Sequence, residues 1–475
     1  MTDKSIPLPQ ASLQDETSLK YMLKLAAPMV VAHISFTAMQ FVDRVMVSRV
    51  GTEALAAVLP AGYVSFIPAS FAIGVMTSVN TFVSQSLGRG DRKACSNYCW
   101  QAIYMGLAYS LVTLAIMRPA APWIFKTLGH DPDVAALEVT YLRIMLYVQF
   151  LAVFVWASSQ FFMGVHRPII MMYTAIVGQV VNVIANYILI FGKLGFPAMG
   201  VAGAAWGTFI GIAAGSLIRM VVFLNSNVNA NFQSRRSLNV NFNRMADLLK
   251  VGFPAGIGLM VNIALWGVIL FKLVGPFGKD ALAATSAVLA CVNVSVMPVV
   301  GLGTALTAAV GKAIGEGKKK VAMKQTSVSL RIAMVYMGFV GLCLLIFRDR
   351  IMAFWSSDDA VVSIGVKIIV LAAIYQAFDA ATLVYNGSLR GAGDTLWLAA
   401  VSAFGAIVVL GIGGMCLIKL FPELGALAPW GAATLSIITV GLANRWRFKT
   451  NRWMRIDLFK RYGGEVPIRD GSAVE

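Results

Sequence analysis

The feature that most constrains this chain is a succession of long apolar blocks separated by short polar breaks, running from about residue 20 to residue 447. A helix needs about 20 apolar residues to cross a hydrocarbon core of about 30 Å. The blocks therefore predict twelve membrane spans, and we expect the longer ones to tilt or to project beyond the bilayer. The approximate spans are 20–49, 54–86, 94–117, 133–163, 168–191, 199–223, 246–274, 280–314, 321–347, 359–388, 394–419 and 425–447.

The composition points to lipid as the surroundings of this chain. Hydrophobic residues make up 58% of it and charged residues 13%, with a mean hydropathy of +0.75, whereas a soluble domain carries about 25% charged residues. The first apolar block, from Tyr21 to Val42, is too long for the apolar region of a signal peptide, and no small-residue cleavage site follows it. We therefore expect an all-α membrane protein whose first span is retained.

The net charge of +17 lies in segments that flank the spans. Spread in this way, it is better explained by the excess of Lys and Arg in cytoplasmic loops than by nucleic-acid binding. The pattern predicts an inner-membrane protein whose two termini and long polar connection at 225–243 face the cytoplasm. The basic clusters behind this prediction are Arg89, Arg92 and Lys93; Arg235, Arg236 and Arg244; Lys318, Lys319 and Lys320; and the tail from Arg445 to Arg469.

Motifs of soluble chemistry do not stand out in the sequence. The five cysteines lack zinc-ligand spacing and imply no disulfide framework, and the three histidines are isolated. No Walker A sequence is present, which disfavours transport driven by ATP. We expect no cofactor and no enzymatic activity.

An internal repeat relates the two halves at an offset of about 227 residues. Six spans per half is an even number, so both halves share one orientation and are related by an axis along the membrane normal. Repeated glycines and prolines are best explained as turns, kinks and close helix contacts. The matching segments are Lys24–Pro28 with Lys250–Pro254, Ala54–Ala57 with Ala281–Ala284, Gly88–Gly90 with Gly315–Gly317, Gly164 with Gly391, and Gly203–Ala205 with Gly431–Ala433.

The repeat predicts a domain layout. We expect a cytoplasmic tail at 1–19, an N-lobe of six spans at 20–224, a cytoplasmic linker at 225–243, a C-lobe of six spans at 244–448 and a basic cytoplasmic tail at 449–475. A substrate site is expected between the two halves, near the middle of the membrane.

Three sets of fragments occur in order along nearly the whole chain. They are Val42-Asp43-Arg-Val-Met-Val-Ser-Arg-Val-Gly with Leu55-Ala-Ala-Val58; Asn182-Val-Ile-Ala-Asn186-Tyr187 with Gly195-Phe-Pro197 and Gly203-Ala-Ala205; and Asp379 with Leu389-Arg-Gly-Ala-Gly-Asp-Thr395. In these fragments and their order the chain resembles the multidrug and toxic compound extrusion (MATE) family, and in particular its NorM-type members. The resemblance implies two six-helix lobes in a V shape and alternating access, with sodium ions or protons entering as an organic cation leaves.

Asp43 is one of the few carboxylates that fall within a span, where an unpaired charge costs several kcal/mol. It shares a helical stripe with Gln40, and its repeat partner is Leu270, so the repeat does not require an acid there. Asp43 is either an interfacial residue helped by Arg44 or an acceptor for a proton or cation inside the first lobe. The resemblance places the coupling aspartate of the family at this position.

A polar stripe on the fifth span carries Gln179, Asn182 and Asn186. These amides are either interhelical hydrogen-bonding groups or ligands that bind sodium or hydrogen-bond Asp43. In the resemblance this stripe faces the aspartate of the first helix. Some relatives have a second carboxylate where Asn186 stands, so a two-acid site is not expected here.

The tenth span carries a second polar stripe with Tyr375, Gln376, Asp379 and Thr382. Asp379 is either half of a structural ion pair or a second cation site, and its repeat partner is Ala152. NorM-type relatives place a coupling Tyr and Asp at Tyr375 and Asp379. They also have a Glu where this chain has Asn262, which leaves the second lobe with one acid and an amide oxygen. Sodium would bind at Asp379 or Asp43.

Together these features predict a secondary active exporter of small organic compounds, of lipophilic cations in particular, coupled to protons or sodium, monomeric and surrounded by membrane lipids. Phe36, Gln40, Met260 and Trp266 could line the substrate cavity through cation–π and adaptable apolar contacts. One alternative is a lipid-linked oligosaccharide flippase of the same superfamily, which would need basic cavity residues such as Arg143 and Arg331. A membrane-embedded enzyme is the other, and it would need clustered polar catalytic groups.

Overall fold

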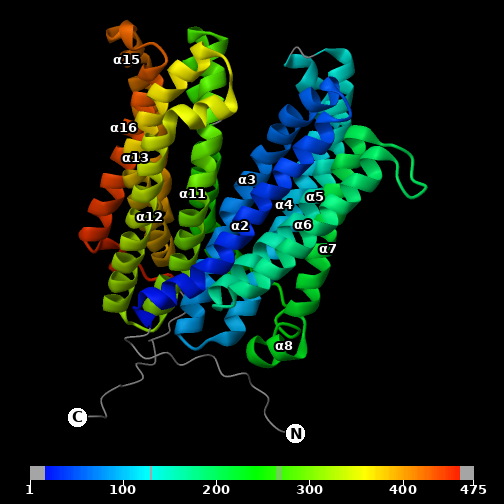
Figure 1. The fold of residues 1–475 in the computed structure, drawn as a ribbon. Coiled ribbons are helices and arrows are strands. Elements are labelled where there is room, and N and C mark those ends of the chain that lie inside the picture. Colours follow the sequence, from blue (N-terminus) through cyan, green and yellow to red (C-terminus); the bar gives the residue numbers. More distant parts are fainter. Residues whose placement is uncertain (1–15, 129–130, 265, 267–268, 461–475) are drawn as a thin grey trace. The chain divides into compact units, whose positions relative to one another are not determined.

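The structure is a computed structural model that describes residues 16–128, 131–264, 266 and 269–460, nearly all of them helical (Figure 1). Within these described residues, twelve helical segments are long and apolar enough to cross a membrane, which confirms the expected all-α membrane fold. The elements of the first half are α2 (Leu19–Ser48), α3 (Thr52–Gly88), α4 (Arg92–Thr127), α5 (Pro132–Gly164), α6 (Pro168–Phe191), α7 (Gly200–Phe223) and the short α8 (Ser226–Phe232). Those of the second half are α9 (Phe242–Ala264), α10 (Leu270–Val274), α11 (Lys279–Gly315), α12 (Lys319–Trp355), α13 (Asp359–Ala392), α14 (Thr395–Phe404), the π-helical η3 (Gly405–Ile412), α15 (Gly413–Leu420), α16 (Leu427–Lys449) and the 3-10 turn η5 (Arg452–Arg455).

Two helices extend well past the apolar runs that predicted them. α4 continues to Thr127 and α12 to Trp355, where hydropathy placed the ends at residues 117 and 347. Buried side chains hold the extra turns, Phe125 in the core of the first half and Met352 in that of the second. Packing, and not the apolar length, therefore sets where these helices end.

The expected seventh span at 246–274 is two helices. α9 ends at Ala264 and α10 begins at Leu270, with Trp266 and Ile269 in π-helical geometry between them. A π turn carries one extra residue and is frequent at functional sites. Trp266 lies beside Tyr375, with the two ring centroids 6.3 Å apart.

The repeated glycines serve the turns and close contacts expected of them. Gly90 follows α3 with φ of 82°, and Gly317 follows α11 with φ of 74°. Residues with a Cβ rarely adopt these positive φ values. A Cβ added at Gly391 would lie 2.7 Å from the carbonyl oxygen of Thr307, and Gly164 stands equally close to α3. The repeat thus preserves turn geometry and the closest helix pairs of each half.

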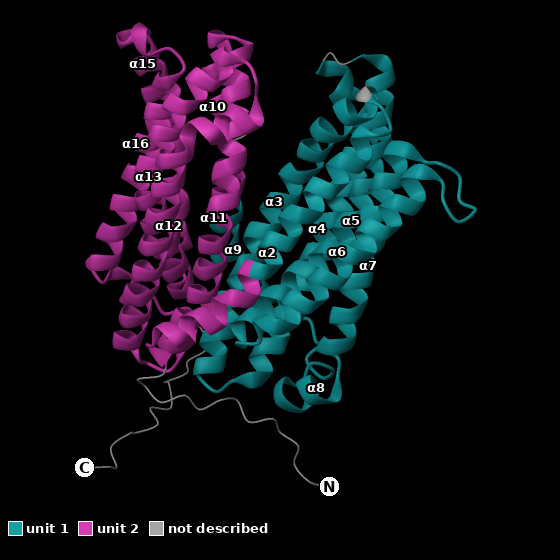
Figure 2. Ribbon diagram, in the orientation of Figure 1, with its two compact units in different colours: residues 1–10, 31–256 teal, residues 11–30, 257–475 magenta. Residues whose placement is uncertain are grey.

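The helices form two compact units (Figure 2). Among the described residues, unit 1 holds 31–256, and unit 2 holds 16–30 and 257–460. The division falls inside α2 and α9, close to Pro28 and Pro254, and not in the segment 225–243. The first turns of α2 therefore belong to unit 2, and those of α9 to unit 1.

Close contacts explain this exchange of helix ends. In unit 1, a Cβ on Gly256 of α9 would lie 2.8 Å from the carbonyl oxygen of Phe71 in α3. In unit 2, Lys312 of α11 donates a hydrogen bond of 2.6 Å to the carboxylate of Glu16, just before α2. The close approach at Gly256 thus attaches the first part of α9 to unit 1, although α9 ends in unit 2. The ion pair of Glu16 with Lys312 attaches the start of α2 to unit 2, although α2 ends in unit 1.

The segment 225–243 is bound along one face of α4 in unit 1. Side chains of α4 donate to its backbone carbonyls: Asn97 Nδ2 to Ser237 at 3.0 Å and Trp100 Nε1 to Ser234 at 2.8 Å. Gln101 both donates to a carbonyl of this segment and accepts from its backbone. The connection between the repeats is therefore an ordered part of unit 1.

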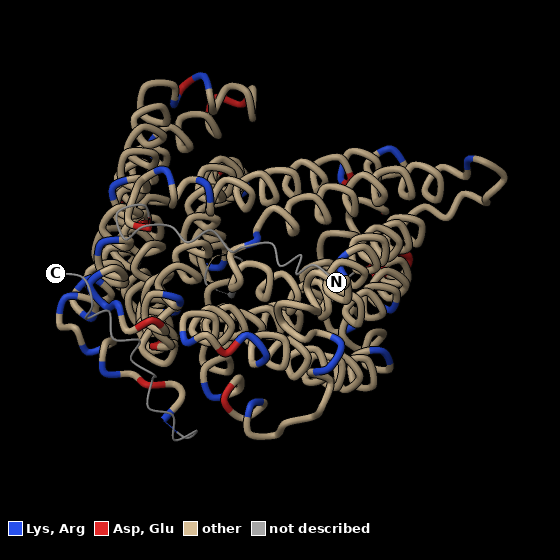
Figure 3. Tube along the Cα trace, turned by 90° about the horizontal axis from the view of Figure 1, so that it is seen from below, with Lys and Arg blue, Asp and Glu red and all other residues tan. Residues whose placement is uncertain are grey.

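Lys and Arg gather at helix ends and turns (Figure 3). Because successive spans alternate in direction, the turn between α3 and α4 and the segment after α7 lie at the same end of unit 1. Likewise, the turn between α11 and α12 and the end of α16 share one end of unit 2. The described residues of the expected basic clusters, which reach Lys460 in the last of them, occupy these ends, so Lys and Arg are concentrated at one end of each unit. The part of the last cluster beyond Lys460 lies outside the described residues.

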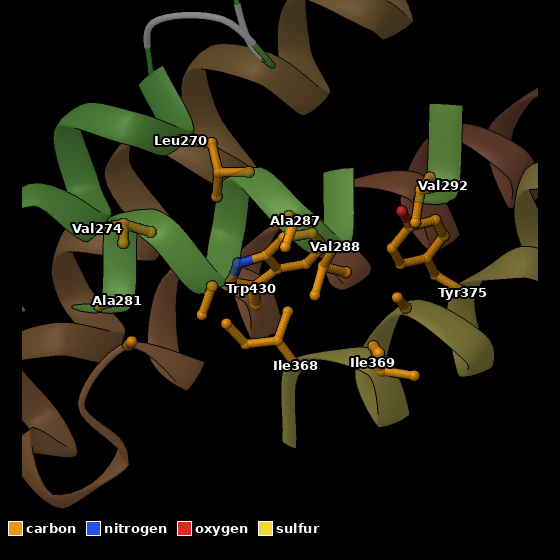
Figure 4. Close-up of a cluster of buried hydrophobic side chains, with 14 of the residues drawn as sticks. Leu270, Val274, Ala281, Ala287, Val288, Val292, Ile368, Ile369, Tyr375 and Trp430 are labelled. Carbon is orange, nitrogen blue, oxygen red and sulfur yellow. The ribbon is translucent and has the colours of Figure 1, made fainter. Parts of the chain in front are cut away.

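The core of unit 2 reaches the candidate site on α13. Trp430 of α16 is fully buried, and its Nε1 donates to Thr285 of α11 at 3.1 Å. Ile368 and Ile369 of α13 pack in the same cluster, and Tyr375 lies at its edge beside Val292 (Figure 4). A rigid apolar wall thus holds Tyr375 in place.

Candidate functional site

A hydrogen-bonded chain of polar side chains joins α2, α6 and α7 in unit 1. Asn186 Nδ2 donates to Asp43 Oδ1 at 2.7 Å and to Asn182 Oδ1 at 3.4 Å. Asn182 Nδ2 lies 3.5 Å from Thr208 Oγ1 in α7. The expected stripe on the fifth span therefore does face the aspartate of the first helix.

Glycines of α7 make room for these amides. Gly203, Gly207, Gly211 and Gly215 recur every four residues and pack on α6. A Cβ added at Gly207 would collide with Asn186 Oδ1. This stripe of small residues was visible in the sequence, and its spacing is typical of closely packed membrane helices; it is the signal that could have identified α7 as the third wall of the site.

Asp43 has an amide donor and no ion pair within the described part of the chain. Its side chain is half-buried, and Arg44 is exposed without bonding to it. Tyr141 of α5 is buried within electrostatic range of Asp43. Asn186 Oδ1 is buried and accepts no hydrogen bond from any described group. Gln179 Oε1, on the same stripe of α6, is likewise buried without a partner among the described residues. The site thus holds one carboxylate, one amide donor bound to it and two spare acceptor oxygens.

In unit 2 the corresponding stripe on α13 is arranged differently. Tyr375 is 1% exposed, and its hydroxyl has no hydrogen-bond partner among the described residues. Gln376 Nε2 donates to Ser295 Oγ of α11 at 2.8 Å, which leaves Gln376 Oε1 buried and unpaired within the same part of the chain. Thr382 is turned toward backbone carbonyls of α13 and α16. Ser295 was not expected here, and its polar position on an apolar helix was its only sequence signal.

Asp379 is half-buried, and the described residues give it no hydrogen bond and no ion pair. Tyr375, one turn away on α13, lies within electrostatic range of its carboxylate. A partner on another helix, which a structural ion pair would require, is not found among these residues. Asp379 thus shares α13 with two buried oxygens, those of Tyr375 and Gln376, that have no partner among the described residues.

The remaining expected residues are less closely joined. Asn262 of α9 is exposed and makes no hydrogen bond to Asp379. Phe36 and Gln40 lie on exposed parts of α2 in unit 1, while Met260 and Trp266 lie half-buried in unit 2. Of these, Trp266 touches a site residue, Tyr375.

The donor chemistry suits a hard cation or a proton. No three His, Cys, Asp or Glu side chains gather into a group within the described ranges. The groups present are carboxylate, amide, hydroxyl and phenol oxygens, which are ligands for hard cations and not for transition metals. Each unit offers one such set.

The comparison with known proteins places the chain in a family of transporters. The MatE family profile matches residues 28–188 and 255–413, one segment in each half. The multidrug resistance protein PmpM of Pseudomonas aeruginosa is 28% identical over 404 residues, which cover 83% of each chain. The multidrug resistance protein NorM of Vibrio vulnificus is 26% identical over 376 residues, 78% of this chain and 82% of the relative.

Solved structures share the fold. An outward-facing multidrug resistance MATE family transporter of the MOP superfamily has a TM-score of 0.84 at 19% identity, covering 95% of this chain and 100% of the other. The eukaryotic MATE transporter AtDTX14 has a TM-score of 0.83 at 18% identity, covering 93% and 97%. With a profile match in both halves and relatives along most of its length, the chain belongs to the MatE family of multidrug efflux transporters, as a protein that crosses the membrane many times.

Proposed function

We propose that this protein exports small lipophilic organic cations in exchange for protons or sodium ions, by alternating access. The observation that carries the proposal is a carboxylate without an ion pair in each unit, Asp43 in α2 and Asp379 in α13. Inside a membrane span such a group is costly unless it serves a bound ion, and it is a functional site by default. The names of the bacterial relatives support multidrug substrates.

Asp43 is suited to carry a proton. In the charged form its Oδ1 accepts the hydrogen bond from Asn186, and its other oxygen remains available to a proton or to a cationic substrate. Protonation weakens the attraction for that substrate, because the carboxylate no longer carries a charge. Entry of a proton and departure of an organic cation are thus coupled through one group that both require.

Asp379 has surroundings that also suit sodium. Sodium, like other hard cations, needs several oxygen ligands, and the Asp379 carboxylate, the Tyr375 hydroxyl and Gln376 Oε1 supply oxygens of this kind. Asn262 would add an amide oxygen only after a change in the position of its side chain. A proton at Asp379 would need none of these additional oxygens.

The test is transport by purified protein in liposomes. Efflux of ethidium is measured under a proton gradient without sodium, and under a sodium gradient at uniform pH. Export driven by either gradient supports the proposal and names the ion. Export that ignores both gradients, or no export of any organic cation by folded protein, would reject ion-coupled drug export and favour the transport of lipid-linked oligosaccharides.

We also propose that the basic end of each unit faces the cytoplasm of the inner membrane. The support is the asymmetry of Lys and Arg described above. Single cysteines placed in the 225–243 segment of a cysteine-free protein should resist an impermeant thiol reagent in intact cells and react after the cells are opened. Labelling from outside would reverse the orientation.

A further inference from the structure

The chain beyond the last span folds back onto unit 2 instead of leaving it. The 3-10 turn η5 follows Asn451, and its Trp453 is 1% exposed. The Trp453 ring stacks on Phe448 at a centroid distance of 5.2 Å and an interplanar angle of 7°. Trp453 Nε1 donates to the carbonyl of Phe448 at 3.0 Å, and Lys319 Nζ of α12 donates to the carbonyl of Met454 at 2.8 Å. The backbone of η5 is therefore held against unit 2.

This anchored segment displays unpaired positive charge. One cation, Arg447, is neutralised by Asp394 at 2.7 Å. The other basic side chains between residues 445 and 460 are exposed, and none forms an ion pair in the described part of the chain. We call them the α16 basic surface: Arg445, Lys449, Arg452, Arg455 and Lys460.

Aromatic side chains mark where the apolar span meets this charge. Trp446 is 49% exposed, and the guanidinium of Arg452 lies over its ring at 5.4 Å. The ring centroid of Trp397 in α14 lies 5.7 Å from that of Trp446. One turn earlier on α16, Leu442 is 54% exposed, as expected of a side chain in contact with lipid. Tryptophan is enriched at the level of the lipid headgroups, so the cations just beyond Trp446 stand where the lipid phosphates lie.

We propose that the α16 basic surface binds the headgroups of acidic phospholipids. Positive charge, a fixed backbone and an interfacial tryptophan meet at the end of one span, and acidic lipids supply negative charge to cations that form no ion pair in the described part of the chain. A basic surface held at headgroup depth attracts acidic lipids through each Lys and Arg, and the attraction falls off within a Debye length. The inference depends on the membrane location of the chain and not on its substrate or coupling ion.

The experiment compares two triple variants that remove the same charge. One is Lys449→Gln/Arg452→Gln/Arg455→Gln in the α16 basic surface. The control is Arg350→Gln/Lys367→Gln/Lys419→Gln, three exposed cations at the opposite end of the spans of unit 2. Each protein in detergent is titrated with phosphatidylglycerol and with phosphatidylcholine, and the bound lipids are counted by native mass spectrometry at low and high salt.

We expect wild-type protein and the control to bind phosphatidylglycerol in preference to phosphatidylcholine, and the α16 variant to bind phosphatidylglycerol about tenfold more weakly. High salt should reduce the preference of the wild type. Equal losses in both variants would show an effect of net charge alone, and no preference in the wild type would show no acidic-lipid site; either result overturns the proposal. If the triple variant unfolds, Arg452→Gln and Arg452→Lys replace it, and only the first should weaken binding strongly.

Discussion

Unit 1 and unit 2 each place one aspartate in a membrane-spanning helix, but they surround it in opposite ways. Asp43 receives a 2.7 Å hydrogen bond from an amide that is itself part of a chain across α6 and α7. Asp379 receives none from the described residues, and the Tyr375 hydroxyl near it is equally without a partner there. A carboxylate that already accepts a hydrogen bond favours a group that only gains or loses a proton, whereas a carboxylate without a described donor favours a site completed by an incoming ion.

The largest effect should come from Asp43→Asn. Because Asn has a similar shape and carries no charge, the variant should insert and fold normally, yet coupled efflux should fall about 100-fold or more, equivalent to about 2.7 kcal/mol. The measurement is ethidium efflux by liposomes that hold equal amounts of folded protein. Normal efflux would show that Asp43 is merely interfacial.

Asp379→Asn should give the next largest loss, about tenfold in gradient-driven efflux, or about 1.4 kcal/mol. We expect a smaller loss than for Asp43→Asn, because the Asn side chain keeps one oxygen ligand. Tyr375 and Gln376 would supply the other oxygens around an ion. Efflux is measured under separate sodium and proton gradients. Full activity under both gradients would mean that unit 2 has no coupling site at this position.

The two networks should also differ in stability. Asn186→Ala removes a donor to a carboxylate, which costs about 1.5–3 kcal/mol, so the thermal midpoint should fall without any ion present. Tyr375→Phe removes a hydroxyl that has no partner among the described residues, so its ion-free stability should change by less than about 0.5 kcal/mol.

A sodium titration separates these variants further. Sodium that binds the native state raises its stability by mass action, and Tyr375→Phe should reduce that rise while Asn186→Ala leaves it intact. A large ion-free destabilisation by Tyr375→Phe would contradict the view of Tyr375 as an unfilled ligand.

The same contrast shows what sequence could and could not predict. Apolar length identified all twelve spans, and the stripe of Asn182 and Asn186 correctly indicated a face opposite Asp43. The π-helical geometry of Trp266 and Ile269 was not predictable, since the sequence on both sides is apolar. The attachment of the 225–243 segment to α4 was also missed, because side chains bonded to backbone carbonyls leave no periodic pattern in the sequence.

The helix exchange shows a further limit. The repeat divides the chain at the 225–243 segment, but compactness divides it inside α2 and α9. Gly256 allows α9 to approach α3 closely, and that contact joins residues of different repeats. A repeat records ancestry and local geometry, while the compact units depend on long-range packing.

The smallest effect should come from Asn262→Ala. The sequence placed Asn262 among the coupling residues, because its amide oxygen stands where relatives of the NorM type have a carboxylate. Its side chain is exposed, however, and makes no hydrogen bond to Asp379, so its loss should change efflux less than about twofold, or about 0.4 kcal/mol. The matched comparison is Gln376→Leu in the same assay, which removes a buried, unpaired oxygen one turn before Asp379 and should cost more. If Asn262→Ala instead matches the loss of Asp379→Asn under a sodium gradient, then α9 must bring Asn262 to the ion during transport, and the ligand set of unit 2 is completed only by movement of that helix.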